Sequence, residues 1–412
     1  MSGLGALDFP EDQVRARARD GAACAFPPVE QYGRRLFGAS VGRCVDELDT
    51  MRLVPPVFMP QRLEKLIDLD REPVHGDVDL TTIIGGLQST MPVYLSAFGS
   101  AEVGGTDLGR AASRQAGALG IPVVLGGDTD GRGGVGGSTL ERIRAYTGTV
   151  PDGWGGVVVQ QGTAGTEVWD QVYRDPAVRP LLEDGRLAFE LKVGQGAGPG
   201  LGGMAVLDAD RAARIADAFA IDPLFGNRVL RSESPGTFTE EILHRQVRLL
   251  CDTFPLARIW VKLPPARDIG SAVRVAWRAG ADAVTVDGAE SGTGWAPSGF
   301  LDHVGLPLAE CLRRIGEPEG CLLVAGRMWE GSRAAKAVAL GARAVGLGRA
   351  ALIAVDEDPE VGLARLAECL ALELRLLISS VGKYAPWALD RDDVWTRPSP
   401  EQILLPEQEV RS

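Results

Sequence analysis

Short apolar runs alternate with amphipathic helical patterns along most of the chain. Nine runs predict strands, at residues 92–98, 122–128, 156–161, 187–193, 228–232, 259–263, 283–288, 322–327 and 344–349. Helical spacing of apolar positions predicts helices at 205–220, 239–254, 269–280, 332–341 and 361–381. Apolar strands that alternate with helices indicate a parallel sheet covered by helices. Nine strands over about 260 residues favour an α/β fold, a (β/α)8 TIM barrel with one extra strand. An open doubly wound sheet is the alternative.

The pattern divides the chain into three parts. Residues 1–90 are irregular, with short helical stretches and proline punctuation. We expect the barrel itself to span residues 91–356. Residues 357–412 are expected to form a C-terminal helix and tail.

Composition and charge exclude several classes of protein. The 412 residues are 45% hydrophobic and 24% charged, as in ordinary globular proteins. The formal net charge of −12 argues against binding nucleic acid or an anionic membrane surface. No apolar run approaches the roughly 18 residues that span a bilayer, and the first residues do not resemble a signal peptide. The sequence therefore predicts a cytoplasmic protein that acts on a small molecule, and it is compatible with a homo-oligomer.

Metal-binding patterns are missing from the sequence. The six cysteines form no C-x-x-C pair, and there are only three histidines. We predict reduced structural thiols and no metal site.

Two glycine–arginine loops follow the last two predicted strands of the barrel. The first contains Gly326 and Arg327, and the second contains Gly346, Gly348 and Arg349. Loops after the seventh and eighth strands of such barrels commonly bind phosphate. Glycines let backbone N–H groups approach a phosphate, a helix N-terminus attracts its charge, and arginine adds a charge-assisted hydrogen bond. This pair of loops predicts a phosphate site, although each loop would also serve as an ordinary turn.

A lysine lies near the end of the apolar run I-W-V-K-L. In a barrel, Lys262 would point inward, where a cation can stabilise negative charge on a reduced flavin ring at its N1/C2-carbonyl edge. The alternative is a structural role, with Lys262 paired to a core carboxylate such as Asp287.

Two further segments stand at predicted strand ends. Residues 191–203 read L-K-V-G-Q-G-A-G-P-G-L-G-G and include Lys192 and Gln195, whereas 286–298 read V-D-G-A-E-S-G-T-G-W-A-P-S. The G-x-G-x-x-G match at 198–203 is a poor dinucleotide fingerprint because no helix opens directly after it. The glycine-dense stretch at 126–137 is a candidate lid, or an ordinary surface loop.

These segments resemble the FMN-binding synthase domain of glutamate synthase. The family writes the first as I-K-x-x-Q-G-A-K-P-G-x-G-G and the second as G-x-D-G-G-T-G-A-S-P. The family's V-K-L lysine falls on Lys262, and its S-x-G-A-M-S-F-G resembles residues 95–100. The resemblance covers about residues 45–385 and is strongest in the second half.

The resemblance implies a TIM barrel that holds FMN across the carboxyl ends of its strands. It implies FMN contacts at Ser96, Ala97, Gln160, Lys262, Gly288, Gly292, Gly294, Gly326, Arg327, Gly348 and Arg349. Lys192 and Gln195 would face the substrate and act with Lys262 as catalytic residues, and Asp128 is a candidate substrate contact.

The chain departs from the family where electrons and substrate would enter. The family's cysteine cluster should follow Ala354, but the sequence there is A-V-D-E-D-P-E-V-G. The T-G-E-G-G motif has become L-G-G-D, so its glutamate is lost unless Asp128 replaces it. Gly198 stands where the family has its second lysine. These departures predict the family's cofactor with a different substrate.

Three functions remain open. We favour an FMN-dependent oxidoreductase that transfers hydride between flavin N5 and an amino or imino acid, without ferredoxin-dependent glutamate synthesis. Oxidation of 2-hydroxy acids is an alternative, although the histidine–arginine signature of that flavin family is absent. The other alternative is a non-catalytic flavin-binding subunit. Retained charges at strand ends, Lys192 and Lys262, favour the enzyme.

Overall fold

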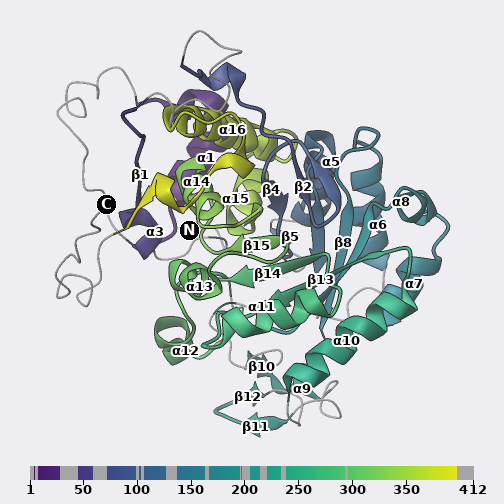
Figure 1. The fold of residues 1–412 in the computed structure, drawn as a ribbon. Coiled ribbons are helices and arrows are strands. Elements are labelled where there is room, and N and C mark those ends of the chain that lie inside the picture. Colours follow the sequence, from purple (N-terminus) through teal and green to yellow (C-terminus); the bar gives the residue numbers. More distant parts are fainter. Residues whose placement is uncertain are drawn as a thin grey trace.

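Eight parallel strands close into a barrel at the centre of the molecule (Figure 1). The computed structural model describes residues 4, 8–27, 45–58, 72–98, 102–103, 106–126, 137–162, 167–194, 196, 205–213, 220–232, 238–292 and 296–396. Around the barrel the strands are β4 (Val93–Leu95), β7 (Val123–Gly126), β8 (Val157–Gly162), β9 (Leu187–Lys192), β13 (Arg258–Leu263), β14 (Ala283–Asp287), β15 (Leu322–Ala325) and β16 (Ala344–Leu347). Strand β16 pairs with β4 and closes the ring. The predicted (β/α)8 barrel is confirmed.

Helices cover the outside of the barrel. They are α5 (Leu108–Leu119), α6 (Gly137–Thr147), α7 (Glu167–Arg174), α8 (Arg179–Glu183), α10 (Glu240–Thr253), α11 (Ile269–Arg278), α12 (Ser298–His303), α13 (Leu308–Ile315), α14 (Gly331–Ala339), α15 (Arg349–Glu357) and α16 (Gly362–Ser380). Helix α10 begins where predicted, because the Thr239 side chain accepts a hydrogen bond from the Ile242 N–H. The apolar faces of these helices and the outward faces of the strands form one large buried cluster.

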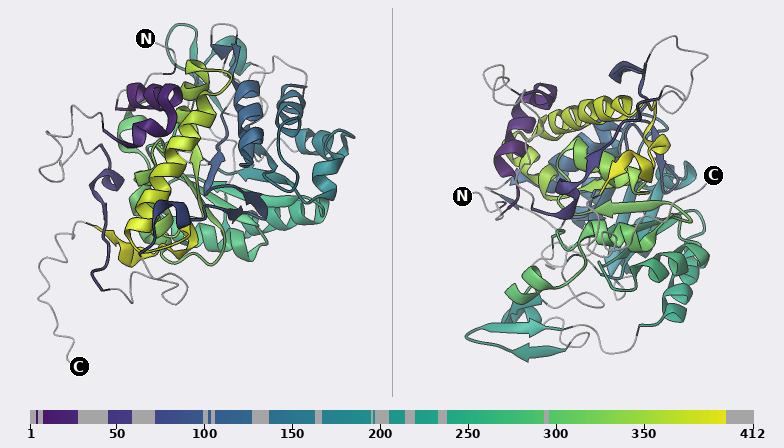
Figure 2. Two further views of the ribbon diagram at one scale, coloured as in Figure 1. Left: turned by 90° about the horizontal axis from the view of Figure 1, so that it is seen from above. Right: turned by 60° about the vertical axis from the view of Figure 1, so that its left-hand side comes forward.

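The ninth predicted strand lies outside the barrel. Strand β12 (Arg228–Arg231) pairs antiparallel with β10 (Ala205–Asp208) and β11 (Ile221–Pro223). This small sheet projects from the body of the molecule, as the right-hand view of Figure 2 shows. The helix predicted at 205–220 is wrong at its start, where β10 precedes the short helix α9 (Ala209–Ala212). Pairing with β12 gives Ala205–Asp208 hydrogen-bond partners that local helical spacing cannot anticipate.

The segments that precede and follow the barrel pack against one side of it. The N-terminal elements are α1 (Glu11–Asp20), a 3-10 helix (Gly21–Ala25), α3 (Glu47–Thr50), β1 (Arg52–Leu53) and a second 3-10 helix (His75–Asp77). Strand β1 pairs with the last strand, β17 (Val394–Trp395), which follows 3-10 helices at Pro386–Ala388 and Arg391–Asp393. Helix α16 lies beside α1 and α15 in both figures. The division at residues 90 and 356 stays a prediction.

A hairpin fills the amino-terminal end of the barrel. Strands β2 (Thr82–Ile84) and β3 (Leu87–Ser89) place Ile84 and Leu87 in the apolar cluster inside the ring. Gly85, at φ +53°, would carry a Cβ only 2.4 Å from the indole nitrogen of Trp260, so this turn requires glycine. A second hairpin, β5 (Glu102–Val103) with β6 (Thr106–Asp107), precedes α5.

Candidate active site

The inside of the barrel changes from apolar to charged toward the carboxyl ends of the strands. Its lower part consists of buried apolar side chains at Tyr94, Val124, Val158, Ala188, Trp260, Ala283, Leu323 and Ala344. Side chains two residues further along each strand point to the same face. This alternation brings Gln160, Glu190, Lys262 and Thr285 into the next layer, all at most 5% exposed. Lys192 and Asp287 follow one layer higher on β9 and β14.

Lys262 forms a buried ion pair with Asp287. Its ammonium lies 3.1 Å from Asp287 Oδ2, and the two residues are 4% and 1% exposed. The backbone N–H of Gly196 also donates to Oδ2, at 3.3 Å. Burial raises the pKa of Asp287, while Lys262 and Lys192 oppose the rise. The structural alternative for Lys262 is thus realised, and the pair still lies at the barrel's carboxyl end, where active sites form.

Glu190 is held by two neighbouring strands. Gln160 Nε2 donates to one carboxylate oxygen at 2.5 Å, and Thr285 Oγ1 donates to the other at 2.7 Å. Burial raises the pKa of Glu190, and the charge of Lys262 lowers it. Gln160, predicted as an FMN contact, therefore donates one of its amide hydrogens to Glu190.

Lys192 stands beside Lys262 across the β9–β13 ladder. Burial, followed by repulsion from Lys262, lowers the pKa of Lys192 to about 8. No carboxylate of the described residues lies within ion-pair distance of its ammonium. Lys192 is still mainly protonated at neutral pH, so the site contains a cation ready for an anionic group.

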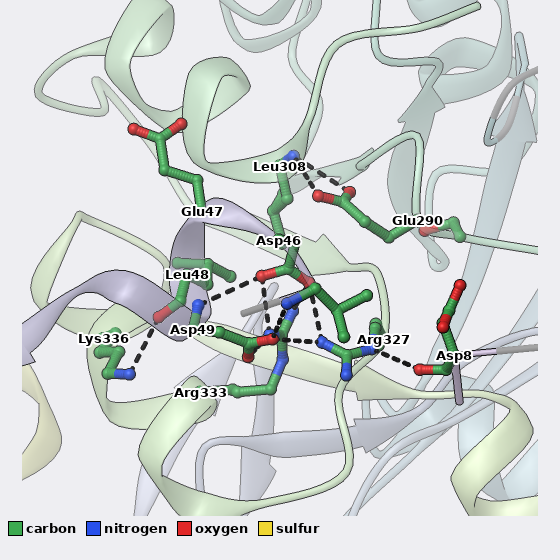
Figure 3. Close-up of polar contacts among 12 residues, drawn as sticks. Asp8, Asp46, Glu47, Leu48, Asp49, Glu290, Leu308, Arg327, Arg333 and Lys336 are labelled. Atoms are coloured by element: carbon green, nitrogen blue, oxygen red, sulfur yellow. Dashed lines mark hydrogen bonds and ion pairs between the residues drawn. The ribbon is translucent and has the colours of Figure 1, made fainter. Parts of the chain in front are cut away.

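The loop after β15 is tied to the N-terminal segment by an acidic pair (Figure 3). Arg327, at φ +51°, donates to Asp49 at 2.7 Å, to Asp46 at 3.2 Å and to the Asp8 carbonyl at 3.2 Å. Arg333, fully buried on α14, contacts the same two aspartates at 2.5–2.8 Å. We call these four side chains the Asp–Arg clamp, which neutralises the charge of Arg327.

The loop after β16 presents its arginine differently. Arg349 is exposed, donates to the Leu4 carbonyl at 2.7 Å and lies over the Phe9 ring. Within the described residues, no carboxylate pairs with it. Gly348 precedes helix α15, and a Cβ placed on Gly348 would meet no atom within 4 Å. An exposed guanidinium without a described carboxylate partner, open space and a helix N-terminus therefore coincide at this loop.

On the neighbouring strand, the segment after β14 is packed around a carboxylate. Glu290 accepts the backbone N–H of Leu308 at 3.1 and 3.2 Å, as Figure 3 shows. Gly288 and Gly326 leave room for this carboxylate, since a Cβ on either would lie near Glu290 Oε2. Burial raises the pKa of Glu290.

The remaining predicted residues divide into two groups. Ser96 is buried and Ala97 half-buried at the end of β4, and Gly292 is exposed beyond β14. Asp128, Gln195, Gly294 and most of the 126–137 loop lie outside the described residues. The described residues hold no group of three or more potential metal ligands. Nor does any helix among them have the length and apolar character to cross a membrane.

Sequence reasoning missed several of these contacts. Glu190 and Thr285 could have been found, because each lies two positions from a residue already singled out and so shares its strand face. Asp46, Asp49 and Arg333 carried no comparable signal, since the aspartates are separated from their partners by more than 270 residues.

Fold and site together define a closed parallel barrel with charged residues at its carboxyl end. Residues 178–357, from just before β9 to the end of α15, match the family model described as the conserved region in glutamate synthase. The chain therefore contains a glutamate synthase-like domain, and the resemblance predicted from its motifs is confirmed.

Individual relatives agree with this assignment. A glutamate synthase large subunit-like protein of Rhizobium meliloti is 31% identical over 214 residues, which are 50% of this chain and 46% of the relative. The archaeal glutamate synthase (NADPH) of Methanocaldococcus jannaschii is 32% identical over 182 residues, 41% of this chain and 34% of the relative. The match thus spans less than half of either relative. In fold, the chain is similar to (S)-mandelate dehydrogenase from Pseudomonas putida, with a TM-score of 0.57, 20% identity and coverage of 95% and 100% of the two chains.

Proposed function

We propose that this protein is an FMN-dependent oxidoreductase that acts on an amino or imino acid. The observation that carries the proposal is the buried Lys262–Asp287 pair beside Lys192, at the carboxyl end of a glutamate synthase-like barrel. Buried charges of this kind are costly for folding alone, because each must be desolvated. Their position at the functional end of the barrel supports a role in binding and chemistry.

The residues present are compatible with FMN. Arg349 and the N-terminus of α15 offer a guanidinium and unpaired N–H groups for a terminal phosphate, and Gly348 leaves the space. At the barrel axis, Lys262 supplies a donor for the ring edge. The buried Asp287 Oδ1 has no hydrogen-bond partner in the described structure, as expected of a site that a ligand completes.

When bound, FMN would supply a two-electron acceptor and donor for hydride transfer. The protein's own residues would bind and orient the flavin and the substrate. Lys262 holds positive charge at the ring edge, and Asp287 fixes the Lys262 ammonium in place. Lys192 and Gln195 would hold the substrate, with Asp128 covering it. Further flavin contacts are proposed at Ser96, Ala97, Gln160, Gly288, Gly292, Gly294 and Gly326, but not at Arg327, which pairs with Asp46 and Asp49.

The proposed reaction differs from ferredoxin-dependent glutamate synthesis. No cysteine follows Ala354 at the position of the family's cluster, so electrons would have no bound iron–sulfur path. Replacement of the family's second lysine by Gly198 also removes a cation that a small dianionic keto acid would use. We therefore propose direct exchange of electrons between flavin and a second substrate, oxygen or a nicotinamide.

The test is the identity and reactivity of the bound chromophore. We expect purified protein to release FMN, identified by mass, and its visible absorbance to bleach anaerobically with at least one amino acid. Bleaching by 2-hydroxy acids alone would establish the alternative oxidase. A colourless protein that cannot be reconstituted with FMN would refute the proposal. Robust glutamate formation from 2-oxoglutarate, ammonia and reduced ferredoxin would refute the proposed difference from ferredoxin-dependent glutamate synthesis.

A further inference from the structure

The two carboxylates inside the barrel, Glu190 and Asp287, differ in whether both of their oxygens accept a hydrogen bond. Both oxygens of Glu190 accept a side-chain hydrogen bond, from Gln160 and Thr285. Asp287 uses only Oδ2, which takes both Lys262 and the Gly196 N–H. Its Oδ1 is buried and has no partner in the described structure. An ionised oxygen left in this state is costly, so Asp287 is suited to accept a hydrogen bond from a ligand.

Lys192 is the complementary case, a cation that no described carboxylate pairs with. Its ammonium attracts Asp287 and is repelled by Lys262, but it has no ion-pair partner among the described residues. The inner layers contain two cations, Lys192 and Lys262, and two anions, Glu190 and Asp287. Arg231, on β12, adds a further positive charge that acts on Lys192, so this end of the barrel favours a ligand that carries a carboxylate.

We propose that the site binds an α-amino acid as a zwitterion, with its carboxylate on Lys192 and its amino group donating to Asp287 Oδ1. This inference rests on the proposed function and specifies its substrate class. A 2-hydroxy acid provides the carboxylate but only one neutral donor, and a 2-keto acid provides no donor. A simple amine provides no carboxylate. Of these ligands, only the amino acid combines a carboxylate for Lys192 with a positively charged donor for Asp287 Oδ1.

The experiment measures binding to FMN-loaded protein by calorimetry, using matched ligands. Four sets share a side chain: alanine, lactate and pyruvate; leucine with its 2-hydroxy and 2-keto acids; phenylalanine, phenyllactate and phenylpyruvate; and glutamate, 2-hydroxyglutarate and 2-oxoglutarate. In at least one set, we expect the amino acid to bind about tenfold or more tightly than its hydroxy acid, as a charged hydrogen bond allows. Absence of binding in all four sets overturns the inference.

Variants then assign the two contacts. Asp287→Asn should bring the amino-to-hydroxy affinity ratio close to one, whereas Lys192→Met should weaken amino, hydroxy and keto acids alike. Glu190→Gln is the matched control, because both Glu190 oxygens are already occupied, and it should keep the wild-type ratio. An unchanged ratio in Asp287→Asn, with FMN still bound, overturns the inference.

A second measurement avoids mutation of the buried pair. The N-trimethyl derivative of the best amino acid keeps the positive charge but has no N–H donor, so wild-type protein should bind it at least about tenfold more weakly. Equal binding overturns the inference. A change in FMN affinity without a change in the ligand ratio would assign Asp287 to the flavin instead. Protein that takes up no FMN refutes the proposed function itself, which is a distinct outcome.

Discussion

The loops after β15 and β16 each carry an arginine at the carboxyl end of the barrel, but the two arginines have different partners. Each places glycine before arginine at the carboxyl end of a barrel strand. Arg327, in the first loop, lies in the Asp–Arg clamp and contacts two aspartates. Arg349, in the second, meets only a backbone carbonyl and an aromatic ring among the described residues. The same motif therefore provides a neutralised cation in one loop and an available cation in the other.

This difference indicates that Arg327 stabilises the fold, whereas Arg349 can bind a ligand. The clamp fastens Asp46 and α3 to the barrel through buried charge, and breaking such a pair is costly. Arg349 is exposed and pairs with no carboxylate among the described residues, so its charge can act on a phosphate. The following predictions test this comparison, beginning with the largest expected effect.

Arg333→Ala should destabilise the protein strongly. Removing a fully buried guanidinium takes away one of the cations that pair with Asp46 and Asp49, at an expected cost of about 3–5 kcal/mol in the free energy of unfolding. Denaturant titration measures this cost. The matched control is Arg313→Ala, because Arg313 also pairs with α3, through Glu47, but is exposed. It should cost no more than about 1 kcal/mol, and similar values for both variants would contradict a structural clamp.

Arg349→Ala should weaken FMN binding while leaving the barrel folded. Loss of a charge-assisted hydrogen bond to phosphate costs about 1.5–3 kcal/mol, or roughly ten- to a hundredfold in affinity. Fluorescence titration of flavin-free protein measures the dissociation constant. Riboflavin, which lacks the phosphate, is the control and should bind wild type and variant equally. Unchanged FMN affinity would show that Arg349 does not contact the phosphate.

Arg327→Ala should change the FMN-to-riboflavin affinity ratio by less than about threefold, because its charge is already neutralised. Its main effect should be a lower melting temperature. A loss of FMN affinity as large as that of Arg349→Ala would instead support the sequence-based prediction that both arginines bind phosphate.

Low pH should weaken the Asp–Arg clamp, because it protonates Asp49. Arg327 and Arg333 hold the pKa of Asp49 below its ordinary value of 3.8, against the effect of burial. A carboxylate with a lowered folded-state pKa stabilises the protein above its unfolded pKa, and this stabilisation is lost as pH falls through the folded value. The difference in unfolding free energy between wild type and Asp49→Asn should therefore be constant above about pH 5 and shrink below pH 3.8. A difference independent of pH would contradict an ionised Asp49 in the clamp.

The local pattern was sufficient for most of the barrel. Alternating apolar strands and helices predicted all eight strands in order, since strand and helix periods are properties of the chain itself. The same alternation placed Lys262 inside the barrel and offered Asp287 as its partner. It failed at Ala205–Asp208, where pairing with β12 overrides helical spacing.

By itself the sequence determined the eight barrel strands, their order and the strand ends at which charged residues and glycines gather. Only the tertiary structure decided which of those charges neutralise one another. Asp46 reaches Arg327 from 281 positions away, and Asp287 leaves one oxygen unpaired because Lys262 and Gly196 both approach the other. Electrostatic interactions depend on distance and burial in three dimensions, and neither is encoded in the local spacing of residues that meet only after the barrel has closed.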